Sequence, residues 1–183
     1  MKGKISLITG PMFSGKTTWL INELSKKQST ELIAVKYFLE KRYAIDSIST
    51  HDGKKLKAES VKNESDILNL LKKNPHVKSI GIDELQFFKP AISILLSELR
   101  EKNINIYAAG LNVDFRNKEW ETTKKVKDIS DFTKTLFALC VICGKRNATI
   151  SRRKGTSKER VVIGGSDIYE PVCEKDYDKE ASI

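Results

Sequence analysis

The residues best suited to chemistry lie near the start of the chain, where two glycines bracket a short loop. The segment reads Gly10-Pro11-Met12-Phe13-Ser14-Gly15-Lys16-Thr17 and matches the pattern G-x-x-x-x-G-K-[ST]. The glycines allow a tight turn whose N–H groups converge on an anion. The lysine amine can then reach the β- and γ-phosphates of a nucleotide, and the threonine hydroxyl can ligate Mg²⁺. A glycine-rich turn with a surface lysine is the alternative, but the flanking strand and helix patterns favour a phosphate-binding loop.

Two adjacent acids, Asp83 and Glu84, follow an apolar run further along the chain. In a parallel α/β sheet this position lies at the carboxyl edge, where ligands bind. Neighbouring strand residues point to opposite sides, so the two acids can divide the work. Asp83 can hold hydrated Mg²⁺, and Glu84 can accept a proton from an attacking hydroxyl. The alternative is a helix cap followed by a glutamate that interacts with the helix dipole.

Three cysteines and one aspartate form two turns near the C-terminus. Cys140 and Cys143 share a C-x-x-C turn, and Cys173 precedes Asp176 at the same spacing. Two such turns can supply the ligands of a structural Zn²⁺, which holds together a segment too small for its own core. Aspartate is a less usual ligand, so water can take the fourth position instead, or the site is degenerate with idle thiols. The C-x-x-C turn and the odd number of cysteines indicate a reducing compartment.

The elements that must position these groups alternate between strand and helix patterns. Apolar runs predict strands over 4–9, 32–38, 77–83, 105–111 and 133–139. Helices are predicted over 16–27, from the N-cap Ser65 to Lys73, and after Pro90, where Ile92, Leu95, Leu96 and Leu99 share one face. This alternation predicts an α/β fold with a parallel sheet flanked by helices on both faces.

The pattern changes in two places. The polar stretch 40–57 predicts a long loop. After residue 138 the chain turns to cysteines, glycines and short β-like runs without a long helix. We therefore expect a nucleotide-binding P-loop domain at 1–138 and a small zinc-ribbon-like domain at 139–183.

Composition and charge exclude several classes of protein. The 183 residues are 39% hydrophobic, which is enough for a folded core and excludes a disordered or fibrous chain. Because no apolar run approaches the roughly 18 residues of a membrane helix and no signal peptide is visible, we expect a cytoplasmic protein without membrane contact. The net charge of +9 comes mostly from Lys, whereas Arg is the residue that reads phosphates and base edges, so no nucleic-acid partner is expected.

Five segments, taken in order, resemble the motifs of the type II thymidine kinases. They are 10–17, Asp83-Glu84-Leu85-Gln86-Phe87-Phe88, Gly110-Leu111-Asn112-Val113-Asp114-Phe115, Cys140-x-x-Cys143-Gly144, and Ile163-Gly164-Gly165-Ser166-Asp167-Ile168-Tyr169 ahead of Cys173. Their order and spacing cover nearly the whole chain, from Lys4 to Tyr177. Five motifs in register are more specific than any one of them.

The resemblance implies ATP-dependent phosphorylation of the 5′-hydroxyl of thymidine or deoxyuridine, a step of nucleoside salvage. It also implies Mg²⁺, a structural Zn²⁺, a homotetramer, inhibition by thymidine triphosphate, and a lasso loop that closes over the nucleoside. By position, Glu84 matches the general base, with Lys16 and Arg42 near the transferred phosphate. The residues expected at the nucleotide are Gly10, Pro11, Met12, Phe13, Ser14, Gly15, Lys16, Thr17, Thr18 and Asp83. Those expected at the nucleoside are Met12, Phe87, Leu111, Phe115, Trp120, Ser151, Val162, Ile163, Gly164 and Tyr169.

The residues themselves leave two of these roles open. Aromatic side chains beside a catalytic carboxylate can form a flat slot for a base, but Phe87, Phe115 and Trp120 can equally belong to the core. The polar segment 151–162 is either a solvated charge run or a lid over substrate.

The main alternative function is a P-loop ATPase whose zinc ribbon acts on nucleic acid. It would need Arg and aromatic residues interleaved on the ribbon, and a water-positioning residue in place of a general base. Arg146, Arg152, Arg153 and Arg160 give this alternative some support. A non-enzymatic zinc-ribbon interaction module is a second alternative.

Overall fold

In a computed structural model of the chain, a six-stranded parallel sheet carries both the phosphate-binding segment and the paired acids. The structure describes residues 1–39, 47–49, 53 and 55–180. The strands lie in the order β5-β2-β6-β7-β1-β8, and every neighbouring pair is parallel. Their bounds are β1 Ile5–Thr9, β2 Leu32–Tyr37, β5 Glu59–Val61, β6 Ser79–Asp83, β7 Asn105–Gly110 and β8 Phe132–Thr135. The predicted α/β class is confirmed.

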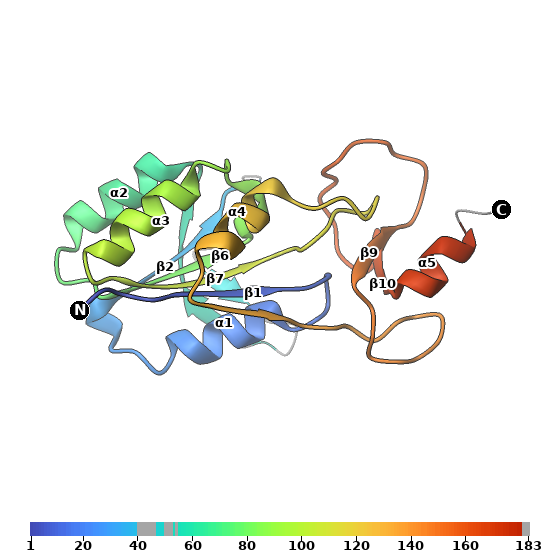
Figure 1. Ribbon diagram of the computed structural model, residues 1–183, viewed down its shortest axis with the longest axis horizontal. Helices are drawn as coiled ribbons and strands as arrows, with labels where there is room; N and C mark the ends of the chain where they lie inside the picture. Colours follow the sequence, from blue (N-terminus) through green and yellow to red (C-terminus); the bar gives the residue numbers. More distant parts are fainter. Residues whose placement is uncertain (40–46, 50–52, 54, 181–183) are drawn as a thin grey trace.

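Helices cover both faces of this sheet (Figure 1). Helices α2 (Glu64–Lys73), α3 (Ile92–Glu101) and α4 (Glu121–Ile129) lie on one face, and α1 (Lys16–Leu24) lies on the other. Two short 3₁₀ turns, η1 (Ser29–Glu31) and η3 (Leu85–Phe87), precede β2 and follow β6. No helix in the described part of the chain has both the length and the apolar character that crossing a membrane requires.

Two buried clusters hold the helices to the sheet. On the α2–α4 face the four apolar residues predicted for α3 are all buried, together with Ile67 of α2 and Val126 of α4. On the opposite face Leu20, Ile21 and Leu24 of α1 pack against Ala34 and Ala109. Full burial of each large apolar side chain stabilises the fold by about 1.5–3 kcal/mol. The three buried side chains of α1 therefore hold this helix, and with it the phosphate-binding turn, against the sheet.

The structure departs from the sequence prediction at several elements. Strands β3 (Ser47–Ser49) and β4 (Lys55–Lys57) form an antiparallel pair inside the stretch expected to be a loop, so that expectation is wrong for these residues. Helix α4 was not predicted, and β8 ends at Thr135 rather than at 139. Asn63, not Ser65, caps α2, because its Oδ1 accepts a hydrogen bond of 3.1 Å from Asp66 N.

The C-terminal part lies beyond one end of the sheet, far from the N-terminus (Figure 1). It contains the antiparallel pair β9 (Ile150–Arg153) and β10 (Tyr169–Val172), followed by α5 (Glu174–Glu180). A third buried cluster forms its core: Ala138, Cys140, Ala148, Ile150, Val172 and Cys173. Val113, from the segment after β7, packs against this cluster and so connects it with the sheet.

Gly10, directly after β1, lies in closely packed backbone. Its φ is +144°, and a Cβ there would lie 2.3 Å from the Leu136 carbonyl oxygen and 2.8 Å from Ser14 Oγ. Leu136 is itself fixed, because its N–H donates to the Thr9 oxygen at 2.8 Å. Only glycine therefore fits where the sheet turns into the phosphate-binding segment.

We predict that Gly10→Ala destabilises the protein much more than Gly15→Ala. Both positions have positive φ, which costs an alanine about 1–2 kcal/mol. Gly10→Ala adds the clash with Leu136, about 1–3 kcal/mol more, whereas a Cβ at Gly15 has nothing within 4 Å. Urea unfolding of the two variants measures the difference, and equal losses of unfolding free energy would contradict the packing argument.

Candidate active site

The phosphate-binding segment forms a tight turn between β1 and α1. Phe13 and Gly15 have positive φ, 65° and 89°, and Ser14 Oγ donates to the Pro11 oxygen at 2.8 Å. Lys16 Nζ donates to the same oxygen at 2.6 Å. The Met12 N–H donates to Ser151 Oγ of β9 at 2.8 Å, so the C-terminal part contacts this turn directly. The loop has the conformation in which consecutive N–H groups can surround an anion.

Thr17 and Asp83, the two residues predicted to hold Mg²⁺, lie in contact. They come from α1 and β6, and β7 separates β6 from β1 in the sheet. The start of α1 nevertheless crosses above this edge, and Thr17 Oγ1 donates to Asp83 Oδ2 at 3.2 Å. A hydroxyl and a carboxylate are the hard oxygen ligands that Mg²⁺ prefers, so this pair fits the cation.

Glu84 has an unusual backbone conformation that differs from the continued strand expected after Asp83. Its φ and ψ are 57° and 39°, the left-handed region, and its N–H donates to Asp83 Oδ1 at 3.0 Å. Both acids consequently line the same cavity, whereas a continued strand would direct them to opposite sides. A non-glycine residue in this region costs about 1–2 kcal/mol.

Gln86 holds the Glu84 carboxylate in place. Its Nε2 donates to Glu84 Oε2 at 2.6 Å, and its Oε1 accepts from the Leu111 N–H at 3.0 Å. Gln86 is buried, and Gly110 lets it approach β7 closely, since a Cβ there would lie 3.3 Å from Gln86 Oε1. The amide thus links the end of β6 to the end of β7.

Burial shifts the proton affinities of two charged groups in this site. Burial, reinforced by the nearby Glu84 carboxylate, raises the pKa of Asp83 to about 7. Burial also lowers the pKa of Lys16 to about 8, although Glu84 and Asp83 partly offset the effect. The amine and the two carboxylates therefore interact strongly through a medium of low polarity.

A cavity of about 330 Å³ opens beside these charges. Lys16, Thr17, Thr18, Asp83 and Glu84 line it, as do Met12, Phe13 and Gly15 from the phosphate-binding turn. All ten residues expected at a nucleoside also line it: Met12, Phe87, Leu111, Phe115, Trp120, Ser151, Val162, Ile163, Gly164 and Tyr169. Gly10, Pro11 and Ser14 shape the turn behind it. Arg42, expected near the transferred phosphate, lies outside the described residues.

The segment 154–168 between β9 and β10, here called the lasso loop, forms one side of this cavity. Arg153 anchors it from β9, donating to the carbonyl oxygens of Ser157, Glu159 and Arg160 and to the Tyr169 hydroxyl at 2.8 Å. Its guanidinium also lies 3.8 Å from the centre of the Phe115 ring. A buried cation with this many contacts holds the loop in one conformation.

Tyr169 completes this anchor. Its hydroxyl donates to the Val162 oxygen at 2.8 Å and accepts from the Val162 N–H at 3.3 Å. Residues 161–164, which include Val162, line the cavity. Residues 154–161 are exposed, whereas residues 162–164 are half-buried beside the pocket. The segment is therefore partly solvated and partly a wall of the cavity.

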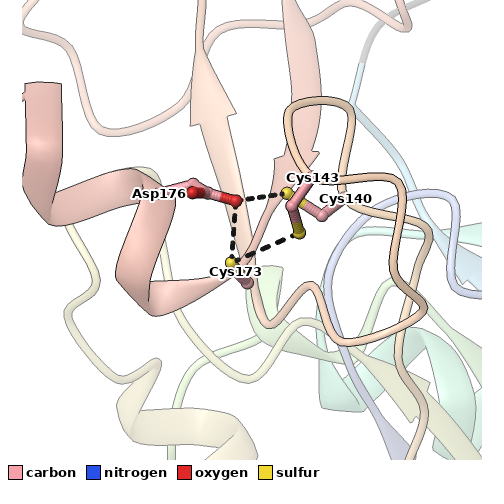
Figure 2. Close-up of side chains that lie close together, drawn as sticks. All are labelled: Cys140, Cys143, Cys173 and Asp176. Atoms are coloured by element: carbon pink, nitrogen blue, oxygen red, sulfur yellow. Dashed lines mark hydrogen bonds between the residues drawn. The ribbon is translucent and has the colours of Figure 1, made fainter.

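The three cysteines and Asp176 gather within 4.8 Å of one another, as Figure 2 shows. Asp176 Oδ2 lies 3.3 Å from Cys140 Sγ and 3.1 Å from Cys173 Sγ, and the sulfurs of Cys143 and Cys173 are 4.0 Å apart. A tetrahedral zinc with Zn–S bonds of ~2.3 Å needs ligand separations of ~3.8 Å, so the cluster is compatible with zinc. Burial, then the bond to Asp176, raises the pKa of Cys173 to about 11, so metal binding must displace this proton.

Sequence reasoning did not identify four residues that shape the site. Gln86 lies two residues after Glu84, and its place at the end of an apolar strand was the available signal. Arg153 and Arg160 stood in a charge-rich segment whose composition suggested solvent exposure. Asp114 pairs with Arg160 at 2.9 Å across 46 residues, a pairing that no local pattern indicates.

The fold and this site together define a P-loop nucleotide-binding enzyme, because a glycine-bounded loop follows β1 and acidic residues end a nearby parallel strand. A family model described as Thymidine kinase matches residues 3–177. The chain therefore belongs to the thymidine kinase family and is an enzyme that transfers a phosphoryl group.

Individual relatives agree with this match. A protein named Thymidine kinase from Pseudothermotoga lettingae is 33% identical over 184 residues, covering 100% of this chain and 98% of the relative. One of the same name from Pyrobaculum aerophilum is 33% identical over 93% of this chain and 96% of its own. A Thymidine kinase from Oryza sativa subsp. japonica is 32% identical over 96% of this chain and 66% of its own.

We predict that Arg153→Lys loosens the lasso loop. Lysine keeps the charge but loses the planar fork that stacks on Phe115 and reaches several carbonyl groups at once. We expect about 2 kcal/mol less unfolding free energy and faster hydrogen exchange of amides 154–162. Arg152→Lys is the matched control, since the neighbouring guanidinium bonds Glu170 instead. Unchanged exchange in Arg153→Lys would show that the guanidinium does not fix the loop.

Proposed function

We propose that this protein transfers the γ-phosphoryl group of ATP to the 5′-hydroxyl of thymidine or deoxyuridine, forming the monophosphate for pyrimidine deoxynucleoside salvage. One observation carries the proposal: Lys16 and Glu84 line the same cavity as the aromatic rings of Phe87 and Trp120. A cation for phosphate and a carboxylate for a hydroxyl thus lie beside an apolar slot wide enough for a base.

The phosphate-binding turn is the proposed site of ATP. Its N–H groups and the N-terminus of α1 would bind the phosphate oxygens, and Lys16 Nζ would move from the Pro11 oxygen to the γ-phosphate. Thr17 and Asp83 would hold Mg²⁺, which when bound neutralises charge on the β- and γ-phosphates. Arg42, which lies outside the described residues, is proposed to act near the transferred phosphate.

Glu84 is the proposed general base for the nucleoside hydroxyl. Its hydrogen bond from Gln86 leaves Oε1 available for the substrate proton and limits rotation of the carboxylate. The left-handed backbone at Glu84 directs this side chain toward the cavity beside Lys16. Alignment of the hydroxyl with the γ-phosphate would supply most of the rate acceleration, and the proton would be transferred late in the reaction.

The lasso loop and the aromatic rings are the proposed nucleoside site. Phe87 and Trp120 meet edge to face with their centres 5.8 Å apart, so they form a fixed wall against which a base can pack. Backbone groups of residues 162–164 can bind the polar edge of a pyrimidine. They would reject the amino group of cytosine, because a misplaced donor leaves buried polar groups unpaired.

We extend the proposal to the organisation of the chain. Residues 1–138 would form the nucleotide-binding domain, and residues 139–183 a small domain in which Cys140, Cys143, Cys173 and Asp176 hold a structural Zn²⁺. The separate buried cluster around Cys140 supports this division. The family further suggests a cytoplasmic homotetramer inhibited by thymidine triphosphate.

Contacts of the arginines argue against a nucleic-acid ATPase. That function requires free guanidinium groups on the ribbon, but Arg152 pairs with Glu170, Arg160 pairs with Asp114, and Arg153 is buried in the lasso loop. Guanidinium groups with intramolecular partners are poorly placed to bind phosphates of DNA or RNA.

We predict that Glu84→Gln loses most of its turnover while nucleotide binding persists. The amide keeps the size of the side chain but cannot accept the hydroxyl proton, so kcat should fall by about 10²–10⁴-fold. Product formation with Mg-ATP and each common nucleoside measures activity, and a nucleotide titration measures binding. Glu98→Gln, on the exposed side of α3, is the control. Full activity of Glu84→Gln would refute the assignment of the base, and a wild-type protein that forms no thymidine monophosphate would refute the function.

We predict that Asp176→Ala weakens zinc binding by at least about tenfold and that Asp176→Cys strengthens it, because the carboxylate supplies the fourth ligand. Zinc content after dialysis against a chelator, and the visible spectrum of the cobalt-substituted protein, report the change. Asp128→Ala on α4 is the control. Zinc retention by Asp176→Ala equal to that of wild type would mean that another group completes the site.

A further inference from the structure

Arg160, in the middle of the lasso loop, reaches across to the turn that precedes α4. Its Nε donates to Asp114 Oδ2 at 2.9 Å, and its NH2 group donates to the Glu119 oxygen at 3.0 Å. Its guanidinium carbon lies 4.2 Å from the centre of the Trp120 ring. One side chain of the loop thus contacts three residues of a single turn, which lies 40 or more residues away in the sequence.

Asp114 is prepared for this contact by its own surroundings. Its side chain is only 2% exposed, and its Oδ1 accepts from the N–H groups of Arg116 and Lys118, both at 3.0 Å. Oδ2 remains for Arg160, whose side chain is 45% exposed. An ion pair with one buried partner differs from a surface pair, because losing the cation leaves a desolvated carboxylate without its counter-charge.

The same arginine fixes two sides of the cavity. Trp120, which it contacts, packs edge to face on Phe87, and both rings line the pocket. Arg160 itself lines the pocket from the loop side, as do the three residues that follow it, Val161, Val162 and Ile163. In the described part of the chain, the polar contacts of the Arg160 side chain go to Asp114 and Glu119 and not to Lys16, Asp83 or Glu84.

We propose that Arg160 is a positioning residue for the nucleoside. Through Asp114, Glu119 and Trp120 it holds the lasso loop against the 114–120 turn before the nucleoside binds. This inference rests on the proposed binding of the nucleoside in the same cavity. A loop that is already ordered lowers the entropic cost of binding, so Arg160 contributes to nucleoside affinity and little to the chemical step.

The first test compares Arg160→Ala and Arg160→Lys with the control Arg146→Ala, which removes an equal charge from the C-terminal part. We expect Arg160→Ala to raise KM for thymidine about tenfold while kcat stays within about twofold and KM for ATP is unchanged. Arg160→Lys should reverse less than half of this rise in KM. The lysine ammonium does not stack flat on an indole ring and does not donate in two fixed directions, as a guanidinium does. Arg146→Ala should match wild type.

A spectroscopic test separates positioning from general stability. The protein has two tryptophans, so Trp19→Phe leaves Trp120 as the sole indole. In that background Arg160→Ala should increase acrylamide quenching of Trp120, and thymidine should reverse the increase. If Arg160 acts through Asp114, Asp114→Asn should raise KM for thymidine similarly. KM of the double variant, Arg160→Ala with Asp114→Asn, should then be no higher than that of either single variant.

The outcomes decide between the two proposals. A wild-type enzyme that phosphorylates thymidine, together with an Arg160→Ala variant of unchanged KM and quenching, would overturn the positioning role and leave the function intact. A loss confined to kcat would also overturn it, since it would indicate direct action on the reacting groups. If Arg160→Ala fails to fold in a thermal melt, Arg160→Lys and Asp114→Asn decide in the same way. A wild-type enzyme inactive on thymidine would instead remove the function on which the inference rests.

Discussion

The site depends on holding one amine and two carboxylates together where water is scarce. Lys16, Asp83 and Glu84 would repel or attract one another too weakly in bulk water to define a geometry, but at the buried edge of the sheet their interactions are strong. The fold supplies this environment by crossing α1 over β6, so that Thr17 bonds Asp83, and by turning the chain sharply at Glu84. The raised pKa of Asp83 and the lowered pKa of Lys16 are the physical signs of that burial.

How much of the fold the sequence predicts depends on how completely each element is buried. The predicted strands β1, β2, β6 and β7 are present because they are apolar runs covered on both faces, and α3 carries a full apolar stripe. The fifth predicted strand, β8, lies at the exposed edge of the sheet and is shorter than predicted. Helix α4 was missed because its sequence, Glu-Thr-Thr-Lys-Lys-Val-Lys-Asp-Ile, contributes one large buried apolar side chain, Val126. Its position comes from the sheet beneath it, a tertiary effect that a local pattern does not contain.

The site was predictable where a motif is continuous in sequence and hidden where it depends on distant pairs. The phosphate-binding turn, the Asp83-Glu84 pair and the cluster of cysteines could each be predicted from short segments of the sequence. The backbone conformation of Glu84 and the bridge from Gln86 to Leu111 could not, because both arise from the meeting of two strand ends. Arg153 and Arg160 were hidden for a further reason: their charges suggest contact with solvent alone. Arg153 is instead buried against the Phe115 ring, and Arg160, although partly exposed, lies over the Trp120 ring.

The hydrogen bond from the Met12 amide to Ser151 Oγ joins the turn after β1 to the hairpin that carries the lasso loop. A shift of either segment destabilises the other, because a partly buried amide that loses its acceptor costs free energy. The donor and acceptor substrates would therefore be linked thermodynamically: the occupancy of each site changes the affinity of the other by the same factor. Such reciprocity would let either substrate change the affinity for the other through the attachment of the hairpin, without a movement of whole domains.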